Sequence, residues 1–344
     1  MHLAGVVELV NNDQSRDFAI DCTALARIEA GGFSPGALSE GLLNKDWVVM
    51  VALSPLFIDK IALTMPVQSQ ALQHRVTERL EDCAENGIIV SAPPYSDLLT
   101  RYHFAYTVPL AGGRNATIQV VPRAERMNFL RLEFNPNNRG RAEEHPFSLI
   151  MSLLCSAWPD FTDALESARL NRLDFAVDIH GVHIDRLGIY HNTRSAFSKQ
   201  FERGGHTTGI YLGKRTSNRQ VVVYDKKREA RECHNLILRG ERTRVEFRVT
   251  DIGSLSALTD MLNPFSSFTL LLYPPCDRTE HDRIFFLDSC RYRGAQAALH
   301  LIQNRRTRAA YRAWLSETCS ASWWRPEAIW DQRMDALQRA FGGG

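Results

Sequence analysis

The chain contains 344 residues, of which 44% are hydrophobic and 23% are charged, and its formal net charge at pH 7 is +2. This length corresponds to about two domains, and the composition excludes a disordered or fibrous chain. The near-zero charge gives no global sign of a nucleic-acid partner. The longest apolar run, Trp47–Ile58, is interrupted by polar residues and is shorter than the roughly 20 residues of a membrane-spanning helix.

The sequence carries no signal for export and no disulfide pattern. The first residues lack the basic start and the hydrophobic stretch of a secretory signal peptide. Seven cysteines are scattered along the chain without a C-x-x-C pair. We therefore expect a cytoplasmic protein without a membrane segment, a disulfide framework or a structural zinc site.

The predicted elements begin after residue 50, since residues 1–50 carry no motif. Short runs in which apolar residues alternate with polar ones predict half-buried strands, and longer periodic runs predict helices. The strands are expected at Ile58–Pro66, Phe129–Asn135, Leu170–Asp178 and Arg242–Arg248, and helical stretches at Ser69–Glu85 and Pro146–Ala168.

The four strands form an internal repeat. Lys60 and Arg131 are 71 residues apart, and Arg172 and Arg244 are 72 residues apart, in segments of similar sequence. Matched spacing of this kind indicates duplication. We expect an α+β fold in which two related β-α-β halves build one large, mainly antiparallel sheet with helices on one face. The expected divisions are an N-terminal segment (1–50), a duplicated core (51–252, with the catalytic half at about 165–252) and a mostly helical C-terminal region (253–344).

The charge is distributed unevenly along this repeat. Residues 1–150 contain 13 basic and 17 acidic residues, whereas residues 203–248 contain 12 basic and 5 acidic residues. Residues 278–344 contain 11 basic and 7 acidic residues. A solvated surface explains many charge runs, but a basic second half also indicates a phosphate-binding surface.

Charged residues of the second half fall on one face of two predicted strands. Alternation places Leu173, Phe175, Val177, Val245 and Phe247 on the core side. If the strands are neighbours, three carboxylates and three arginines share the other face: Asp174, Asp178, Glu246, Arg172, Arg244 and Arg248. These groups could form cross-strand ion pairs. Alternatively, the carboxylates could hold Mg²⁺ or Mn²⁺ while the arginines bind phosphate.

A hairpin is predicted between these two strands, with strands at 208–215 and 219–226. Tyr224 lies near the end of its second strand and is expected to share a face with Lys226. Most strand tyrosines serve packing. Because a phenol has a pKa near 10, it needs a nearby cation to act as a nucleophile. Lys226 or a bound metal would supply that cation.

Motifs of other enzyme classes are missing. The sequence contains no P-loop, no G-x-S-x-G or H-E-x-x-H motif, no G-x-G-x-x-G fingerprint, and no pair of histidines two residues apart. His180 and His183 flank a predicted turn and are expected to be surface or supporting groups.

The motifs that are present form an ordered set. The runs 171–178 (NRLDFAVD), 210–226 (IYLGKRTSNRQVVVYDK) and 243–248 (TRVEFR) resemble the replication initiation factor family, also called Rep_trans. The run 129–136 (FLRLEFNP) is similar to a segment of its phage-type members. Members of this family are rolling-circle initiators of plasmids and filamentous phages, and some are relaxases. The resemblance spans about residues 55–250 and rests on the set and its spacing.

The resemblance implies a metal-dependent enzyme of a bacterial cytoplasm that nicks and later rejoins one strand of single-stranded or supercoiled origin DNA. A tyrosine keeps the 5′-phosphate, and the freed 3′-hydroxyl primes a host polymerase; a host helicase and a second copy of the chain are further partners to consider. By motif position, the catalytic residues are Tyr224 and Lys226, and the Mg²⁺ or Mn²⁺ ligands are Asp174, Asp178 and Glu246. The DNA-binding residues are Lys214, Arg215, Arg219, Lys227, Arg244 and Arg248.

Two other functions fit the same residues. A non-catalytic DNA-binding regulator would bury Tyr224 and pair its carboxylates with arginines, and a metal-dependent nuclease would use water without a covalent intermediate. The C-terminal arginines Arg305, Arg306, Arg308 and Arg312 belong either to a helical cap on the sheet or to an element for origin recognition or dimerisation.

Overall fold

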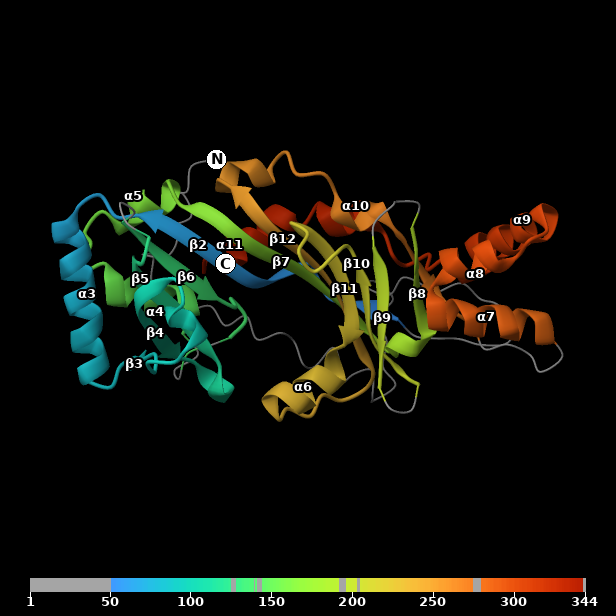
Figure 1. The fold of residues 1–344 in the computed structure, drawn as a ribbon, viewed down its shortest axis with the longest axis horizontal. Helices are drawn as coiled ribbons and strands as arrows, with labels where there is room; N and C mark the ends of the chain where they lie inside the picture. Colours follow the sequence, from blue (N-terminus) through green and yellow to red (C-terminus); the bar gives the residue numbers. More distant parts are fainter. Residues whose placement is uncertain are drawn as a thin grey trace, which may run out of the picture.

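The computed structural model describes residues 51–342 except 125–127, 139, 141–143, 192–195, 203–204 and 275–279 (Figure 1). The segment 1–50 therefore lies outside the described residues. Strands and helices are mixed along the rest of the chain, and one large antiparallel sheet dominates the fold. This arrangement confirms the α+β class that the sequence predicts.

The main sheet contains eleven strands, ten of them in the order β3-β4-β5-β6-β2-β7-β12-β11-β10-β9, while β1 pairs with one end of β7. A separate two-stranded sheet joins β13 to β8. The bounds are β1 Ala52–Leu53, β2 Phe57–Pro66, β3 Val90–Ser91, β4 Tyr102–Pro109, β5 Asn115–Pro122, β6 Phe129–Phe134, β7 Arg169–His180, β8 Leu187–Tyr190, β9 Phe197–Phe201, β10 Thr207–Leu212, β11 Arg219–Asp225, β12 Arg242–Gly253 and β13 Thr269–Leu272.

The helices lie where the periodic runs are, with some differences in length. The helix α3 begins after Ser69, whose hydroxyl caps it by accepting a hydrogen bond from the backbone N–H of Leu72. The stretch expected at 146–168 forms two helices instead of one. The bounds are α3 Gln70–Glu85, α4 Pro146–Leu154, α5 Phe161–Glu166, α6 Lys226–His234, α7 His281–Arg293, α8 Ala295–Leu301, α9 Arg305–Trp314, α10 Pro326–Trp330 and α11 Arg333–Ala340.

The sheet has the same strand order on both sides of its centre. From β2 outward the order is β6, β5, β4, β3, and from β7 outward it is β12, β11, β10, β9. At the centre of the sheet Ile61 faces Leu173. On either side of this pair, Lys60 faces Asp174 and Ala62 faces Arg172, so each residue faces the repeat equivalent of the other. This symmetry is what two copies of one unit would produce when their first strands pair.

The two halves differ in register at the next strand. In the first half Glu133 on β6 faces Ala62. In the second half Arg248 faces Asp174, and Glu246 instead faces Ala176, two residues further along β7. Glu246 and Asp174 are therefore diagonal neighbours on one face of the sheet, close enough for their side chains to interact.

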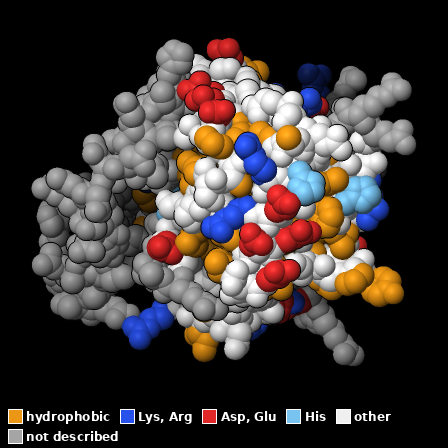
Figure 2. All heavy atoms as spheres, turned by 90° about the vertical axis from the view of Figure 1, so that its left-hand side faces the viewer, with side chains coloured by type: hydrophobic (Ala, Val, Ile, Leu, Met, Phe, Trp, Pro, Cys, Tyr) orange, Lys and Arg blue, Asp and Glu red, His pale blue; other side chains and the backbone are white. Residues whose placement is uncertain are grey.

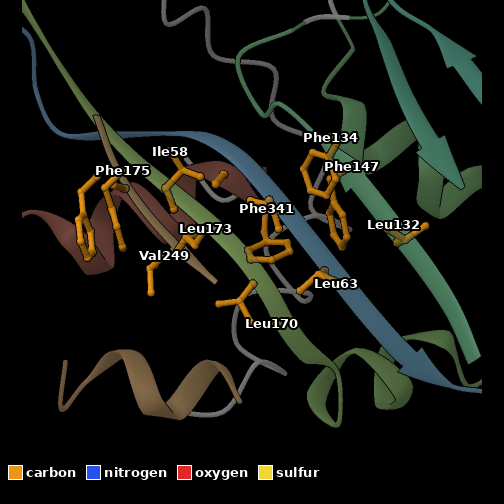
Figure 3. Packing of buried hydrophobic residues seen from close by; sticks show 14 of the residues in the cluster. Ile58, Leu63, Leu132, Phe134, Phe147, Leu170, Leu173, Phe175, Val249 and Phe341 are labelled. Carbon is orange, nitrogen blue, oxygen red and sulfur yellow. The ribbon is translucent and has the colours of Figure 1, made fainter. Parts of the chain in front are cut away.

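The core lies on the opposite face, as the alternation predicts. Phe175 packs edge-on against Trp330 of α10 at a centroid distance of 5.0 Å. Phe341, which follows α11, contacts Phe147 of α4 at 5.0 Å (Figure 3). The C-terminal helices thus cover the seam where the two halves of the sheet meet. A buried cluster of this size contributes stability in proportion to the apolar area it removes from water.

A second, smaller hydrophobic cluster lies under α7, α8 and α9, and Leu287, Cys290, Leu299 and Leu315 are buried in it. These three helices project from the end of the molecule that carries β8 and β9 (Figure 1). Within the described residues, no helix combines the length and apolarity needed to cross a bilayer.

Candidate functional site

The candidate site lies on the polar face of three adjacent strands, β7, β12 and β11. The pairing places Asp178, Arg244 and Tyr224 in one row across these strands. A second row joins Asp174 to Arg248. The structure therefore brings together the acidic residues and the tyrosine that the sequence singles out, on the face opposite the core.

Asp174 is the most perturbed carboxyl group of the site. Its residue is 1% exposed, and Arg172 donates to both of its oxygens, at 2.9 Å from Nε and 2.6 Å from Nη2. Burial raises the pKa of Asp174 to about 7, although the hydrogen bond from Arg172 opposes this. The negative charge of Glu246 raises the pKa further. Two buried carboxylates therefore lie close enough to repel each other.

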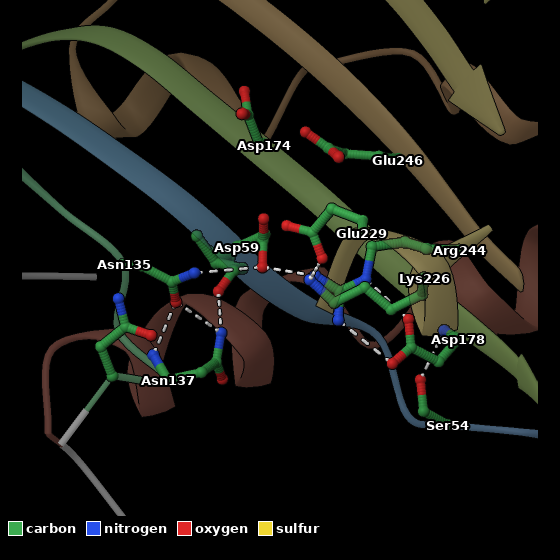
Figure 4. A network of polar contacts seen from close by, with 12 residues as sticks. Ser54, Asp59, Asn135, Asn137, Asp174, Asp178, Lys226, Glu229, Arg244 and Glu246 are labelled. Atoms are coloured by element: carbon green, nitrogen blue, oxygen red, sulfur yellow. Dashed lines mark hydrogen bonds and ion pairs between the residues drawn. The ribbon is translucent and has the colours of Figure 1, made fainter. Parts of the chain in front are cut away.

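Glu246 has a similar setting on β12. It is 2% exposed, and Arg248 donates to it at 2.7 Å from Nε and 3.3 Å from Nη2. Its strand neighbours are the small Ala176 and the apolar Val222, which leave its carboxylate turned toward Asp174 (Figure 4). Neither neighbour offers a hydrogen-bonding side chain.

Asp178 is held differently, by an arginine that is itself buried. Arg244 donates to its two oxygens at 2.7 Å and 3.1 Å, and the Asp178 backbone N–H donates to Ser54 Oγ at 2.8 Å. A third bond runs from Arg244 Nη1 to Asp59 Oδ1 at 2.6 Å. Burial alone would lower the pKa of Arg244, but Asp59 and Asp178 together raise it. Arg244 thus does not reach the surface, which differs from its expected contact with DNA.

Asp59 is not among the residues that the sequence singles out, because strand alternation places it on the core face. The β2–β7 register shifts between Ile58 and Lys60, so Asp59 is the additional residue of a bulge. A bulge re-aims the side chain of its extra residue. Asn135 Nδ2 also donates to Asp59 Oδ1 at 3.1 Å. No sequence signal marks this bulge.

Tyr224 lies at the end of β11 and is partly buried. Burial raises the pKa of its phenol well above the ordinary value; Arg244 lowers it, and Glu246 and Asp59 raise it further. This is the opposite of the lowered pKa that a nearby cation would produce. Its hydroxyl makes no hydrogen bond to any described residue. The phenol is therefore protonated, and the negative charge of Glu246 opposes its ionisation.

Lys226 does not continue the strand, contrary to the prediction from the sequence. Asp225 caps the helix α6, since its carboxylate accepts a hydrogen bond from the backbone N–H of Arg228 at 3.0 Å, and Lys226 is the first residue of that helix. The Lys226 ammonium donates to Glu229 Oε2 at 2.6 Å and lies 6.0 Å from the centroid of the Tyr224 ring. It thus contacts the ring face while its charge is paired with Glu229.

The remaining DNA-binding candidates lie at two places. Lys214, Arg215 and Arg219 are exposed at the turn that joins β10 to β11. Lys227 is on α6 and pairs with Glu241 at 3.0 Å. Arg248, described above, keeps 35% of its side chain exposed while it holds Glu246. The three basic side chains at the turn are thus the most accessible of the DNA-binding candidates.

Next to the site, a chain of histidines and carboxylates fixes the start of α6. His183 lies 3.6 Å from Asp225 and 3.4 Å from Asp185, and His206 Nδ1 lies 2.7 Å from Asp185. Asp225 raises the pKa of His183 by hydrogen bonding. His183 is thus a supporting group of the strand end that carries Tyr224, in line with the sequence expectation for it.

The carboxylates of the site meet some of the requirements for binding a divalent cation. No group of three His, Cys, Asp or Glu side chains that could hold a metal occurs among the described residues. Mg²⁺, however, is often bound by one or two carboxylates, with water and substrate phosphate as its other ligands. Asp174 and Glu246 provide two adjacent carboxylates, and their mutual repulsion is the condition that a cation relieves. Asp178 fits less well, because the Arg244 that bonds both of its oxygens is itself buried and also held by Asp59, whereas the arginines on Asp174 and Glu246 are partly exposed.

Comparisons with known proteins identify no family for the chain. No protein-family model matches it, and no curated protein matches it either. Among solved structures, a rolling circle replication initiator protein from Geobacillus stearothermophilus aligns over 71% of this chain and 99% of its own, with 14% identity and a TM-score of 0.37. The di-domain ARO/CYC BexL from the BE-7585A biosynthetic pathway aligns over 71% of this chain and 97% of its own, with 9% identity and a TM-score of 0.13. At these TM-scores neither likeness defines a fold or an activity for this chain.

Proposed function

We propose that this chain initiates rolling-circle DNA replication by nicking one strand of an origin through Tyr224 in a metal-dependent strand transfer. One observation carries the proposal: Asp174 and Glu246 are buried side by side on β7 and β12, and Tyr224 lies on the next strand. Two buried carboxylates that repel each other are an unfavourable packing choice, and such perturbed groups concentrate at functional sites.

In this proposal Asp174 and Glu246 hold Mg²⁺ or Mn²⁺. The bound cation would polarise the scissile phosphate and neutralise developing charge. Arg172 and Arg248, whose side chains are 31% and 35% exposed, would turn outward and bind phosphate oxygens in place of the carboxylates. Asp178, the third proposed ligand, orients Arg244 and through it the end of β11.

The reaction requires the Tyr224 oxygen to form a bond to phosphorus while the bond from phosphorus to the 3′-oxygen breaks. The phenol gives up its proton, the departing 3′-oxygen gains one, and the 5′-phosphate stays on the tyrosine. Rejoining is the reverse of these steps. A cation held by Asp174 and Glu246 would balance the charge of Glu246, which raises the pKa of Tyr224, and would thereby favour loss of the phenol proton.

The DNA strand would pass over the β10–β11 turn. Lys214, Arg215 and Arg219 are exposed there and form no ion pair with a described residue. Lys227 lies on α6, which follows the other end of the hairpin, and it pairs with Glu241. These groups would contact the backbone without reading sequence.

A second function, that of a non-catalytic DNA-binding regulator, is favoured by one observation. Each of the three carboxylates is paired with an arginine, and burial raises the pKa of Tyr224 instead of activating it. In that protein the same groups would serve only to hold the sheet together. The partial exposure of Arg172 and Arg248 is what the first function needs, because guanidinium groups that reach solvent can bind phosphate oxygens.

One assay separates these functions and the water-using nuclease. The full chain is incubated with Mg²⁺ or Mn²⁺ and with overlapping single-stranded oligonucleotides that tile the DNA on both sides of its coding sequence. Oligonucleotides labelled at the 3′ end should transfer their label to the protein on a denaturing gel. Labelled DNA fragments without labelled protein would indicate the nuclease. Intact DNA that is merely bound would indicate the regulator.

A further inference from the structure

A set of arginines lies at the surface far from the candidate site, on the projecting helix α9. Arg305, Arg308 and Arg312 recur at spacings of three and four residues, so they lie on one face of the helix, with Arg306 at its side. No residue of α9 is buried, and the helix contains no acidic residue. None of the four arginines forms an ion pair with a described residue. This face is therefore a strip of unbalanced positive charge.

Next to the arginine face, the ring of Tyr311 and, one turn further, the ring of Trp314 fix α9 to α7. Phe286 of α7 lies 4.5 Å from the Tyr311 ring and 6.3 Å from the Trp314 ring, measured between centroids. Arg283 of α7 stacks over Trp314 at 5.3 Å. These contacts hold α9 in one orientation, in which Arg305 and Arg312 are exposed and Arg308 is partly exposed. We call the helices α7, α8 and α9 the arm.

The approach to α9 is a tight turn. Only residues 302–304 separate α8 from α9, and Asn304 caps α9 by accepting hydrogen bonds from the backbone N–H groups of Arg306 and Thr307 at 2.9 Å and 3.1 Å. The short turn and the capped start fix where α9 begins after α8, so the exposed, basic helix is presented at a defined place.

We infer that α9 docks in the major groove of duplex DNA. The groove admits one α-helix, and arginines spaced over about 10 Å of helix can reach phosphates on its two sides. The end of the molecule that carries α3 offers a contrast: Figure 2 shows basic, acidic and hydrophobic side chains interspersed there. This role is separate from the proposed nicking site, because the arm would hold double-stranded DNA next to the strand that is cut.

The test compares two variants of the full chain that lose the same charge. One is Arg305→Gln/Arg308→Gln/Arg312→Gln in the arm. The matched control is Arg75→Gln/Arg101→Gln/Arg325→Gln, three exposed arginines on other parts of the chain. Binding is measured by fluorescence anisotropy with a labelled duplex of about two helical turns, at several salt concentrations between about 50 and 200 mM.

The arm variant should bind the duplex roughly tenfold or more weakly, and the slope of log K against log salt should fall by about 0.9 for each phosphate that the arm no longer neutralises. The control variant should bind as the unaltered chain does. Equal binding by all three proteins, or equal weakening in both variants, would overturn the inference. A change of oligomeric state in the arm variant, with duplex binding intact, would overturn it in favour of a second copy of the chain as the partner.

The outcome is independent of the nicking proposal. The arm variant should still form the labelled adduct with single-stranded oligonucleotides, since no arm residue lies at the candidate site. Loss of duplex binding with adduct formation intact supports the arm alone, whereas duplex binding without any adduct would contradict only the nicking function.

Discussion

Arg244 on β12 reaches across β7 and donates to Asp59 on β2 at 2.6 Å, so one buried guanidinium joins the two halves of the sheet. The same group holds Asp178 on β7 and stacks 4.8 Å from the Phe57 ring centroid. Three strands thus meet at one side chain beside Tyr224.

Replacing Arg244 should therefore destabilise the fold. Arg244→Met leaves Asp178 buried without its partner and should lower the free energy of unfolding by about 3–5 kcal/mol. Urea denaturation measures this change. Arg75→Met, at an exposed arginine on α3, is the control, and it should alter stability by less than about 0.5 kcal/mol. Equal effects of the two substitutions would show that the Arg244 network does not stabilise the sheet.

Asp174 predicts an unusual dependence of stability on pH. Its pKa in the folded protein, about 7, lies above the ordinary value of 3.8, so the folded protein binds an extra proton between these values. Stability should fall as pH rises through that window, because Asp174 must ionise while it is buried. Asp174→Asn should be more stable than the unaltered chain at about pH 8 by up to a few kcal/mol, and the difference should shrink toward pH 4. Urea denaturation across this range, without divalent cation, provides the check; a difference that does not vary with pH would be the contrary result.

His183 predicts a smaller stabilisation that is present at low pH. Its pKa is raised, first by its hydrogen bond to Asp225, so the stabilisation is present below the ordinary pKa and is lost as pH rises through the raised pKa. His183→Gln should reduce stability at about pH 5.5, by less than about 1 kcal/mol because the pair is partly exposed, and should have little effect at about pH 8.5. His103→Gln, at an exposed histidine, should be neutral at both values. A loss that persists unchanged at high pH would mean that His183 acts by packing alone.

The proposed cation site predicts a difference between the two halves of the sheet. Glu133 occupies the matching motif position in the first half, but Lys60 and Arg131 pair with it, and its β2 neighbour Ala62 carries no carboxylate. Glu246→Gln should abolish Mn²⁺ binding and nicking without unfolding the protein, whereas Glu133→Gln should leave both unchanged. Calorimetric titration with Mn²⁺ gives the binding, and circular dichroism gives the folding. Retained Mn²⁺ binding in Glu246→Gln would place the cation elsewhere.

Much of this fold follows from local patterns. Alternation predicts that Leu173, Phe175, Val177, Val245 and Phe247 lie on the core face, and all five are buried. The helix start at Ser69 follows from its capping side chain and the apolar period after it. These features depend on neighbours within a few residues, which a sequence displays directly.

Other features depend on partners that are distant in sequence. Asp59 enters the site only because β2 bulges against β7, and Glu246 adjoins Asp174 only because β12 pairs two residues out of step with β6. Lys226 leaves the strand because Asp225 caps a helix at that point. A bulge and a register are set by the packing of whole strands, and strand and helix compete closely at a boundary. The sequence therefore predicts which residues gather around Tyr224, but it does not predict which of them form hydrogen bonds and ion pairs with each other.

The most direct test of the proposed nicking function is adduct formation by Tyr224→Phe beside Tyr211→Phe. Tyr211 is on the neighbouring strand β10, and its hydroxyl donates to Gln200 at 3.0 Å, so the two variants remove the same atom from adjacent strands. With 3′-labelled single-stranded DNA and Mn²⁺, Tyr224→Phe should lose labelled protein by roughly a thousandfold or more while still binding DNA, and Tyr211→Phe should retain it. An adduct that survives in Tyr224→Phe would contradict the assignment of Tyr224 as the nucleophile.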